Sequence, residues 1–264
     1  MVTNLRVKPQ SEQVGKINPF VCAFKSMGDN KYEGAIVEVS KQLAEQFGMS
    51  VALVDMAFYT SDIRRKMPSS PIAYDIRSRL ENCHNKCIPG LLDYFHDKCM
   101  RDKSGLKDVV INMKVGRGKV VLLPAKRKLD SDVDWIVHSN YELDLKANLF
   151  VKESSLWDSL YNDLIELCLG IDIILINTPL GLEDSFNKIA LADPAVNLVF
   201  YFSDCVDNQE VEKSILRRIA TPDKIITVAS NSDSLFNKSL LTDQSISFTP
   251  KAIADNILAV YNKK

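Results

Sequence analysis

Short apolar runs bounded by polar residues recur along the chain and predict buried β-strands. The first run is 20–24, and the second is 51–54, directly before Asp55. Between them lies a segment whose apolar positions follow the period of one helix face. Those positions are Ile36, Val39, Leu43 and Phe47, and Gly48 follows where a left-handed helix C-cap is expected. The segment therefore predicts strand, helix and strand, with the two strands paired in parallel through a right-handed crossover.

The later runs continue this pattern to the end of the chain. Residues 109–113 and 119–124 read as two strands joined by a turn that contains Gly-Arg-Gly. More buried strands are predicted within 171–177, at 196–203 and at 224–229, and amphipathic helices at 156–167 and 250–261. Alternating strands and helices predict an α/β fold, with a mostly parallel twisted sheet and helices on both faces. Ligands of such sheets bind at the carboxyl ends of the strands.

Composition and charge are those of a globular protein and exclude several functions. The chain has 264 residues, of which 46% are hydrophobic and 25% charged, and its formal net charge is −1. This charge gives no general attraction for nucleic acid, and no apolar run is long enough for a membrane span. The polar start shows no secretory signal, so we expect a cytoplasmic protein with six reduced cysteines. Residues 1–18 read as a flexible lead-in and 19–264 as a single α/β domain.

Three segments carry a resemblance to a known family. Residues 42–48 read Gln-Leu-Ala-Glu-Gln-Phe-Gly, and residues 53–55 read Leu-Val-Asp. Residues 171–182 read IDIILINTPLGL, which is similar to the pattern YDxIxIDTPPGL. All three resemble segments of the ParA/MinD family of deviant-Walker P-loop ATPases, in the family's order and spacing. The resemblance covers about residues 19–262 and implies a P-loop NTPase-like sheet of ParA/MinD topology.

The family's phosphate loop, KGGxGK[ST], is altered in this chain. The corresponding residues, SMGDNKYE, keep Gly28. Counting back from the helix puts Tyr32 at the lysine position and Glu33 at the Ser/Thr position, whereas a one-residue shift would make Lys31 the lysine. A carboxylate about 4 Å from a phosphate charge costs roughly 4 kcal/mol at an effective dielectric near 20. Asp29 and Glu33 together would therefore oppose about as much free energy as micromolar binding supplies, roughly 8 kcal/mol.

Two of the acidic positions that the resemblance implies are also altered. Asp55 matches the first acid of the family's DxD, but Ala57 replaces the second, which helps to position the attacking water. Asn177 stands where the family's Walker B aspartate holds the Mg²⁺-bound water. An amide has no negative charge with which to hold Mg²⁺ or its water. Gly28, Lys31, Asp55 and Asn177 would then mark a vestigial nucleotide site with no catalytic residue and no metal ligand.

These losses lead to a hypothesis of a pseudo-ATPase with a degenerate Walker A motif and no cofactor. Such a protein would use the fold as a protein-binding scaffold that positions or partitions a cellular machine, such as a chromosome, division site, pilus or flagellum. Homodimerisation is expected because the family dimerises. The alternative is an active ATPase of unorthodox type, in which Lys31 or Lys25 serves phosphate and Asp55 alone serves Mg²⁺. ATP and Mg²⁺ would be cofactors only in that case.

A cysteine–histidine cluster and two basic clusters lie outside the family motifs and have interpretations of their own. Cys83, Cys87, His96 and Cys99, with His84 beside them, could close a tetrahedral zinc site, although the spacing is not that of common zinc motifs. A metal-binding module is thus a third hypothesis, and buried or idle thiols are the other reading. The basic clusters Arg64, Arg65, Lys66 and Lys126, Arg127, Lys128 are candidates for nucleic acid or an acidic partner, or are solvated faces.

Overall fold

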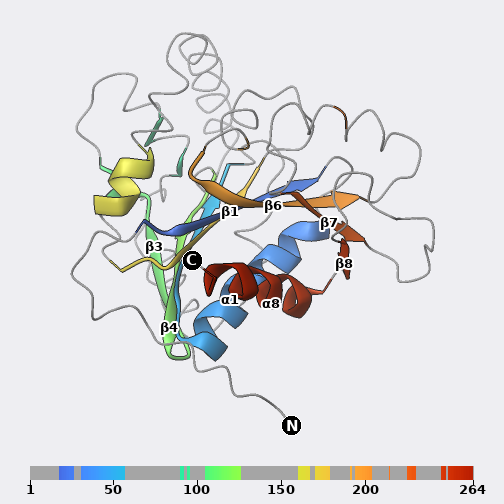
Figure 1. Ribbon diagram of the computed structural model, residues 1–264. Coiled ribbons are helices and arrows are strands. Elements are labelled where there is room, and N and C mark those ends of the chain that lie inside the picture. Colours follow the sequence, from blue (N-terminus) through green and yellow to red (C-terminus); the bar gives the residue numbers. More distant parts are fainter. Residues whose placement is uncertain are drawn as a thin grey trace.

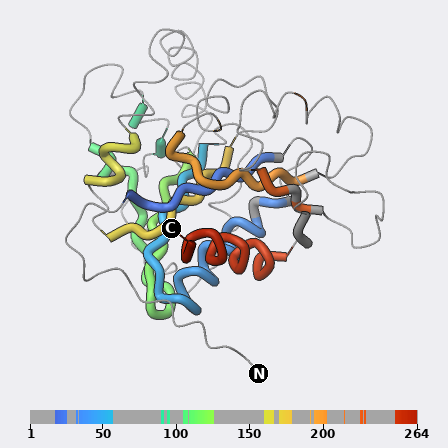
Figure 2. The backbone as a smooth tube through the Cα atoms, viewed as in Figure 1, coloured from blue at the N-terminus to red at the C-terminus, as the bar shows by residue number. Residues whose placement is uncertain are grey.

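The computed structural model describes residues 18–26, 31–56, 90–91, 94–95, 105–125, 160–166, 170–178, 191, 194–203, 214, 225–229, 245–247 and 249–263. These residues build one eight-stranded sheet with helices packed against it (Figures 1 and 2). The strands are β1 (Phe20–Ser26), β2 (Ser50–Asp55), β3 (Ile111–Val115), β4 (Gly118–Leu123), β5 (Ile173–Asn177), β6 (Val196–Ser203), β7 (Ile225–Ala229) and β8 (Ser245–Ser247). The helices are α1 (Lys31–Phe47), η1 (Leu106–Asp108, a short 3-10 turn) and α8 (Pro250–Tyr261). The predicted α/β class is thereby confirmed.

The strand order is β3-β4-β2-β5-β1-β6-β7-β8, and all neighbours pair in parallel except β3 with β4. The predicted direct pairing of the first two strands is wrong, because β5 lies between β1 and β2 and pairs with both. β1 and β2 remain parallel within the sheet, with α1 as their connection. The strand β8 was not predicted, because its three residues, Ser-Ile-Ser, contain no apolar run.

The helix α1 is the next described element after β1 and covers one face of the sheet. Its buried positions Ile36, Val39 and Leu43 are those of the predicted apolar face. It ends in an αL cap, in which the Gly48 amide donates to the Ala44 carbonyl, and the Met49 amide donates further back to the Leu43 carbonyl. Gly48 has the left-handed φ of 70° that this cap requires. The cap turns the chain straight into β2.

The helix α8 lies beside α1 on the same face of the sheet (Figure 1). The Thr249 side chain caps it by accepting a hydrogen bond from the Ala252 amide at 3.2 Å, and Pro250 takes the first turn. Ile253 and Ile257 are fully buried in the same core cluster as the α1 residues, and Tyr261 packs edge-on against Phe20. The amphipathic helix predicted at 250–261 is therefore present, and its apolar face docks on the sheet.

The opposite face of the sheet is covered by a second core cluster. It includes Leu91, Tyr94 and Phe95 from one segment and Leu160 and Leu164 from another. The Tyr94 hydroxyl donates to Asp163 at 2.8 Å and joins these two segments. Burial, the Asp163 hydrogen bond and the Asp163 charge all raise the pKa of Tyr94, so its phenol stays neutral. Helical segments therefore pack on both faces, as the sequence predicts.

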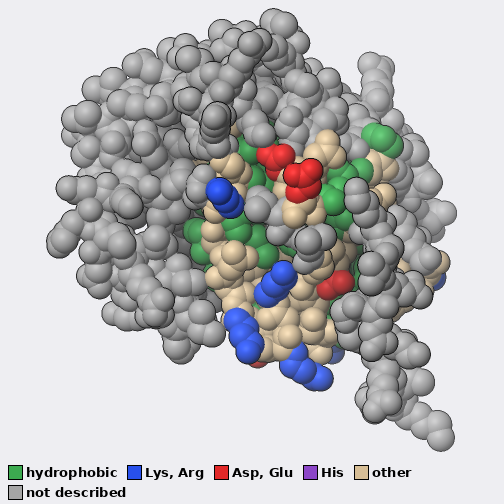
Figure 3. All heavy atoms as spheres, turned by 90° about the vertical axis from the view of Figure 1, so that its left-hand side faces the viewer, with side chains coloured by type: hydrophobic (Ala, Val, Ile, Leu, Met, Phe, Trp, Pro, Cys, Tyr) green, Lys and Arg blue, Asp and Glu red, His purple; other side chains and the backbone are tan. Residues whose placement is uncertain are grey.

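The β3–β4 hairpin forms one edge of the sheet. Its loop has two residues, Gly116 and Arg117, and is shorter than predicted. Gly116 has a φ of 56° and lies against the end of α1, where an added Cβ would meet Glu45 Cα at 2.9 Å. Figure 3 views the molecule from this side and shows Lys and Arg side chains at the lower end of the face. The hairpin is thus held against α1 while its charged side chains remain outside.

Candidate functional site

Three central strands end side by side at the carboxyl edge of the sheet. The register aligns Phe24 of β1 with Asn177 of β5, and Asn177 with Asp55 of β2. Side chains alternate along a strand, and the neighbours of these residues in the α1-side core are Cys22, Leu53 and Leu175. Phe24, Asp55 and Asn177 therefore share the face that α1 covers, next to the first turn of that helix.

Asp55 and Asn177 contact each other directly. The Asn177 Nδ2 donates to Asp55 Oδ1 at 2.8 Å. Asp55 is 2% exposed and Asn177 is fully buried, so the hydrogen bond lies out of solvent. Asp55 makes a further interaction, whereas Asn177 Oδ1 has no hydrogen-bond partner among the described residues. An amide donor facing a carboxylate stabilises the charge by a charge-assisted hydrogen bond.

The backbone fixes the three strand ends around this pair. Thr178 donates twice to the Phe24 carbonyl, from its amide at 3.1 Å and from its hydroxyl at 2.8 Å. The Met56 amide donates to the Asn177 carbonyl at 2.8 Å. The chain leaving each strand is thus bonded to the neighbouring strand, which holds the side chains of Asp55 and Asn177 in place.

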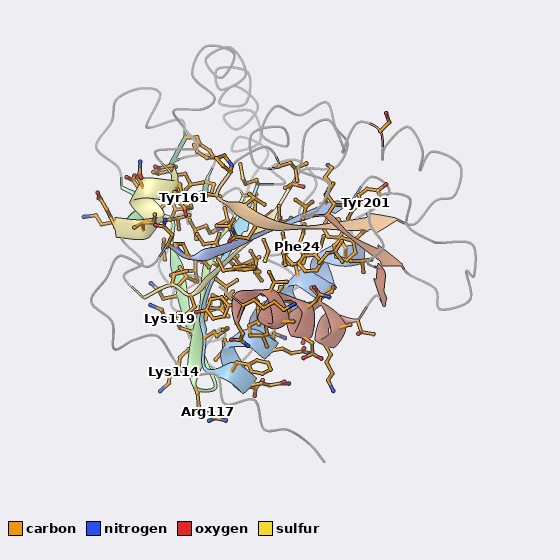
Figure 4. All side chains as sticks on the ribbon, in the orientation of Figure 1. Phe24, Lys114, Arg117, Lys119, Tyr161 and Tyr201 are labelled. Atoms are coloured by element: carbon orange, nitrogen blue, oxygen red, sulfur yellow. The ribbon has the colours of Figure 1, made fainter. Side chains whose placement is uncertain are left out.

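Tyr32, the second residue of α1, closes the site from the helix side. Its hydroxyl donates to the Thr178 carbonyl at 3.2 Å, and the residue is only 2% exposed. Its ring stacks on Phe202 at 5.1 Å between centroids, and Phe202 in turn stacks on Phe24 at 6.1 Å. A continuous aromatic layer therefore runs from the start of α1 to β1, where Figure 4 labels Phe24.

Lys25 is a buried lysine near the end of β1. It is 0% exposed and aligns with Tyr201 of β6, which Figure 4 labels. Because it follows Phe24 on the strand, its side chain lies on the face opposite to Asp55 and Asn177. Lys25 makes an interaction with the rest of the chain, as a buried ammonium requires. The sheet thus separates this lysine from the Asp55–Asn177 pair.

The described residues of this edge do not fit Mg²⁺ in the manner that the family resemblance implies. Mg²⁺ takes oxygen ligands and favours carboxylates. Here an N–H donor of Asn177 already faces the Asp55 oxygen, and the amide contributes no charge. Tyr32 brings a phenol ring, with its hydroxyl engaged, to the start of α1. No group of three His, Cys, Asp or Glu side chains suited to a metal is found within the described residues.

The structure brings together two of the four residues predicted for the site. Asp55 and Asn177 are in contact, and Lys31 is the first residue of α1. Gly28 lies outside the described residues, as does Asp29. So do both predicted basic clusters and the cysteine–histidine cluster, namely Arg64, Arg65, Lys66, Lys126, Arg127, Lys128, Cys83, His84, Cys87, His96 and Cys99.

Sequence reasoning missed the partners of Tyr32. The residue stands out in the sequence only as a substitution in the phosphate loop. Its hydrogen-bond partner Thr178 is 146 residues away, and its stacking partner Phe202 belongs to β6. The one available signal was the aromatic pattern of β6, Phe-Tyr-Phe, next to a strand end.

Solved structures show that the fold is of the ParA/MinD, P-loop NTPase-like type. A Borrelia burgdorferi plasmid partition protein superposes with a TM-score of 0.57 at 14% identity, covering 94% of this chain and 99% of that one. Another partition protein structure from the same organism, bound to AMPPNP, gives 0.56 at 16% identity over 94% and 99% of the chains. Cobyrinic acid a,c-diamide synthase from Mycobacterium smegmatis, with a bound ATP analog and magnesium, gives 0.52 at 16% identity over 93% and 82%.

These structural likenesses establish the fold. At the level of sequence, no protein-family model and no curated protein matches the chain. Within the described residues, no helix is both long enough and apolar enough to cross a membrane.

Proposed function

We propose that this protein is a catalytically inactive member of the ParA/MinD fold group that acts as a protein-binding scaffold. Its work would be the positioning or partitioning of a cellular machine such as a chromosome, division site, pilus or flagellum. The observation that carries the proposal is the hydrogen bond of 2.8 Å between Asn177 Nδ2 and Asp55 Oδ1. It stands at the strand ends where the resemblance places the first acid of the DxD motif and the Walker B aspartate.

Electrostatics explains why this contact argues against a nucleotide-metal site. Two carboxylates at this distance would repel strongly unless a cation or a proton lay between them. An amide in place of one carboxylate removes the repulsion and supplies the donor itself. The protein therefore keeps this edge intact with its own side chains, and no divalent cation is required to hold the two strand ends together.

Tyr32 supports the same conclusion by packing. Its ring is buried between α1 and Phe202, and its hydroxyl is bonded to the Thr178 carbonyl. Releasing the ring would forfeit buried aromatic surface and break this hydrogen bond. The start of α1 is thus tied to the strand ends, which favours one fixed arrangement over a loop that closes on a phosphate.

The solved neighbours suggest the kind of work the scaffold does. Two of them are plasmid partition proteins, one with AMPPNP bound. A protein of the same fold without nucleotide chemistry would keep partner-binding surfaces while losing the nucleotide-dependent switch. A homodimer, if formed, would then be constitutive, and its mass would not change when ATP and Mg²⁺ are added.

Two assays test the proposal. Phosphate release from ATP with Mg²⁺ should stay at the level of a protein-free control, and affinity purification of the tagged full chain should return a specific protein partner. Saturable hydrolysis that disappears in Asp55→Asn would instead establish the unorthodox ATPase. Asp55→Asn is the informative variant because it removes the charge while keeping the size of the side chain.

A further inference from the structure

The β3–β4 hairpin carries three cationic side chains at the amino edge of the parallel strands. Lys114 and Arg117 are exposed and Lys119 is half-buried. Figure 4 labels all three along the hairpin, and Figure 3 shows the corresponding face from outside. We call these three residues the hairpin cations. They are clustered by the register of the hairpin itself, since Lys114 lies directly opposite Lys119.

The hairpin cations form no close ion pair with an acid of the described residues. Among the described residues, none of the three forms an ion pair within 4.0 Å, and the ion pair seen there joins Lys41 to Glu38. Like charges directly opposite each other on neighbouring strands are unfavourable. Arg117 has a local role, because it packs beside Gly48 at the negative end of the α1 dipole. Asp172 interacts electrostatically with Lys119 and compensates part of its charge, whereas Lys114 forms no ion pair with an acid in the described part of the chain.

Among the described residues, no strand pairs with β3 on the side away from β4. In a two-residue hairpin, the two residues that flank the loop exchange backbone hydrogen bonds; here they are Val115 and Gly118. From that pair onward, hydrogen-bonded and non-hydrogen-bonded residue pairs alternate along the two strands. Asn112 and Lys114 therefore direct their backbone N–H and C=O groups away from β4. Both side chains are exposed. β3 is the outermost strand of the described sheet, so this edge has the geometry to accept another strand.

We propose that β3 is a docking edge for an acidic, extended segment of a partner protein. The segment would add a strand to the sheet, bonding to the backbone of Asn112 and Lys114, and its alternate carboxylates would lie beside Lys114, with Lys119 one strand further across the sheet. A protein strand fits better than a nucleic acid, because only a peptide backbone can continue the ladder. The formal net charge of −1 also gives no general field for nucleic acid.

This docking edge lies at the far end of the sheet from Asp55 and Asn177. Lys119 aligns with Ser50, the first residue of β2, whereas Asp55 is its last. Five residues of strand separate the two positions by about 17 Å. The inference names a partner class for the proposed scaffold, but it does not require that the nucleotide site be inactive.

The test uses a fluorescent peptide of alternating Asp and Thr, about ten residues long, which is the upper length of common strands. Fluorescence anisotropy with the full chain should show saturable binding. Lys114→Glu should weaken it at least about tenfold, because a favourable charge contact becomes a repulsive one. Lys251→Glu is the matched control: it makes the same charge change at an exposed site on α8 and should leave the affinity unchanged. Asn177→Leu should also leave it unchanged, which separates this inference from the proposed function.

Two further probes distinguish a strand from mere charge attraction. A peptide of alternating Asp and Pro has the same charge but lacks half of the N–H donors, and should not bind. Hydrogen exchange should show new protection of the Asn112 and Lys114 amides only with the Asp-Thr peptide. Equal binding of both peptides, absence of binding, or tighter binding of a DNA strand of the same charge without that protection would each overturn the proposal.

Discussion

Replacing Asn177 with aspartate puts a second carboxylate against Asp55 and measures what the amide does. Two unit charges at the observed 2.8 Å repel by about 6 kcal/mol at an effective dielectric of 20. Binding one proton to the pair removes this repulsion at a lower cost in free energy. That costs about 1.4 kcal/mol for each pH unit above an ordinary carboxyl pKa of about 3.9, or roughly 4 kcal/mol at pH 7. We therefore expect Asn177→Asp to lower the free energy of unfolding by about 4 kcal/mol at pH 7.

The stability cost of Asn177→Asp depends on pH. The introduced acid is disfavoured only while it is charged, so its cost is absent at low pH and grows as pH rises. Urea unfolding should show a cost of roughly 1.5 kcal/mol at pH 5, against roughly 4 kcal/mol at pH 7. Asn177→Leu, which loses the hydrogen bond without adding charge, should cost about 1–3 kcal/mol, with no added slope between those pH values.

A swap of the two side chains completes the test. The double variant Asp55→Asn with Asn177→Asp restores one amide and one carboxylate, so it should recover most of the stability that Asn177→Asp loses. If Asn177→Asp proves as stable as the parent at pH 7, or its cost does not change between pH 5 and pH 7, the direct amide–carboxylate contact is refuted.

Three further predictions concern the surroundings of the site and the hairpin. Tyr32→Phe should lower the free energy of unfolding by about 1 kcal/mol in urea titrations, because it removes the hydrogen bond to Thr178; no loss would mean that this bond contributes nothing. Gly118→Ala should lower the free energy of unfolding by roughly 3 kcal/mol or more, because the added Cβ would lie 2.6 Å from the Ala44 carbonyl oxygen. Gly34→Ala is the control in α1, where an added Cβ meets open space, and it should raise the free energy of unfolding by up to about 1 kcal/mol. Thermal unfolding that ranks the two variants the other way would contradict the packing of the hairpin on α1. Burial raises the pKa of Asp172 despite its hydrogen bond from Ser50 and the charge of Lys119. The contribution of this carboxyl to stability is therefore greatest below about pH 3.9 and is lost as pH rises through its folded-state pKa. Asp172→Asn should gain stability relative to the parent from pH 4 to pH 7 in urea unfolding, and a relative loss would contradict the raised pKa.

The elements that sequence predicted well are those decided by local pattern. The face of α1, the cap at Gly48 and the start of α8 at Pro250 each follow from residues within a few positions of one another. The contact between Asp55 and Asn177 was within reach for a different reason. Both residues end apolar runs, and the carboxyl ends of parallel strands meet at one edge.

What the sequence did not predict depends on contacts between distant segments. The pairing of β1 with β2 was expected from their closeness in the chain, but β5, which lies more than a hundred residues later, inserts between them. No local pattern decides which of several apolar strands takes that central place. The bond from Tyr32 to Thr178 depends on the same insertion, because β5 brings Thr178 beside the start of α1. The substitution of Tyr32 in the phosphate-loop motif therefore indicated that the nucleotide site is altered. The contacts that Tyr32 makes instead depend on the tertiary fold.

The most direct test of the proposed loss of nucleotide chemistry is a calorimetric titration of the full chain with ATP and Mg²⁺, carried to millimolar nucleotide. We expect no saturable heat of binding, because Asn177 supplies a donor rather than a charge at the strand edge and Tyr32 is packed at the start of α1. Saturable binding at micromolar nucleotide would contradict it. That result would require Tyr32 and Asn177 to rearrange around a phosphate and metal, and would return nucleotide chemistry to the centre of the protein's function.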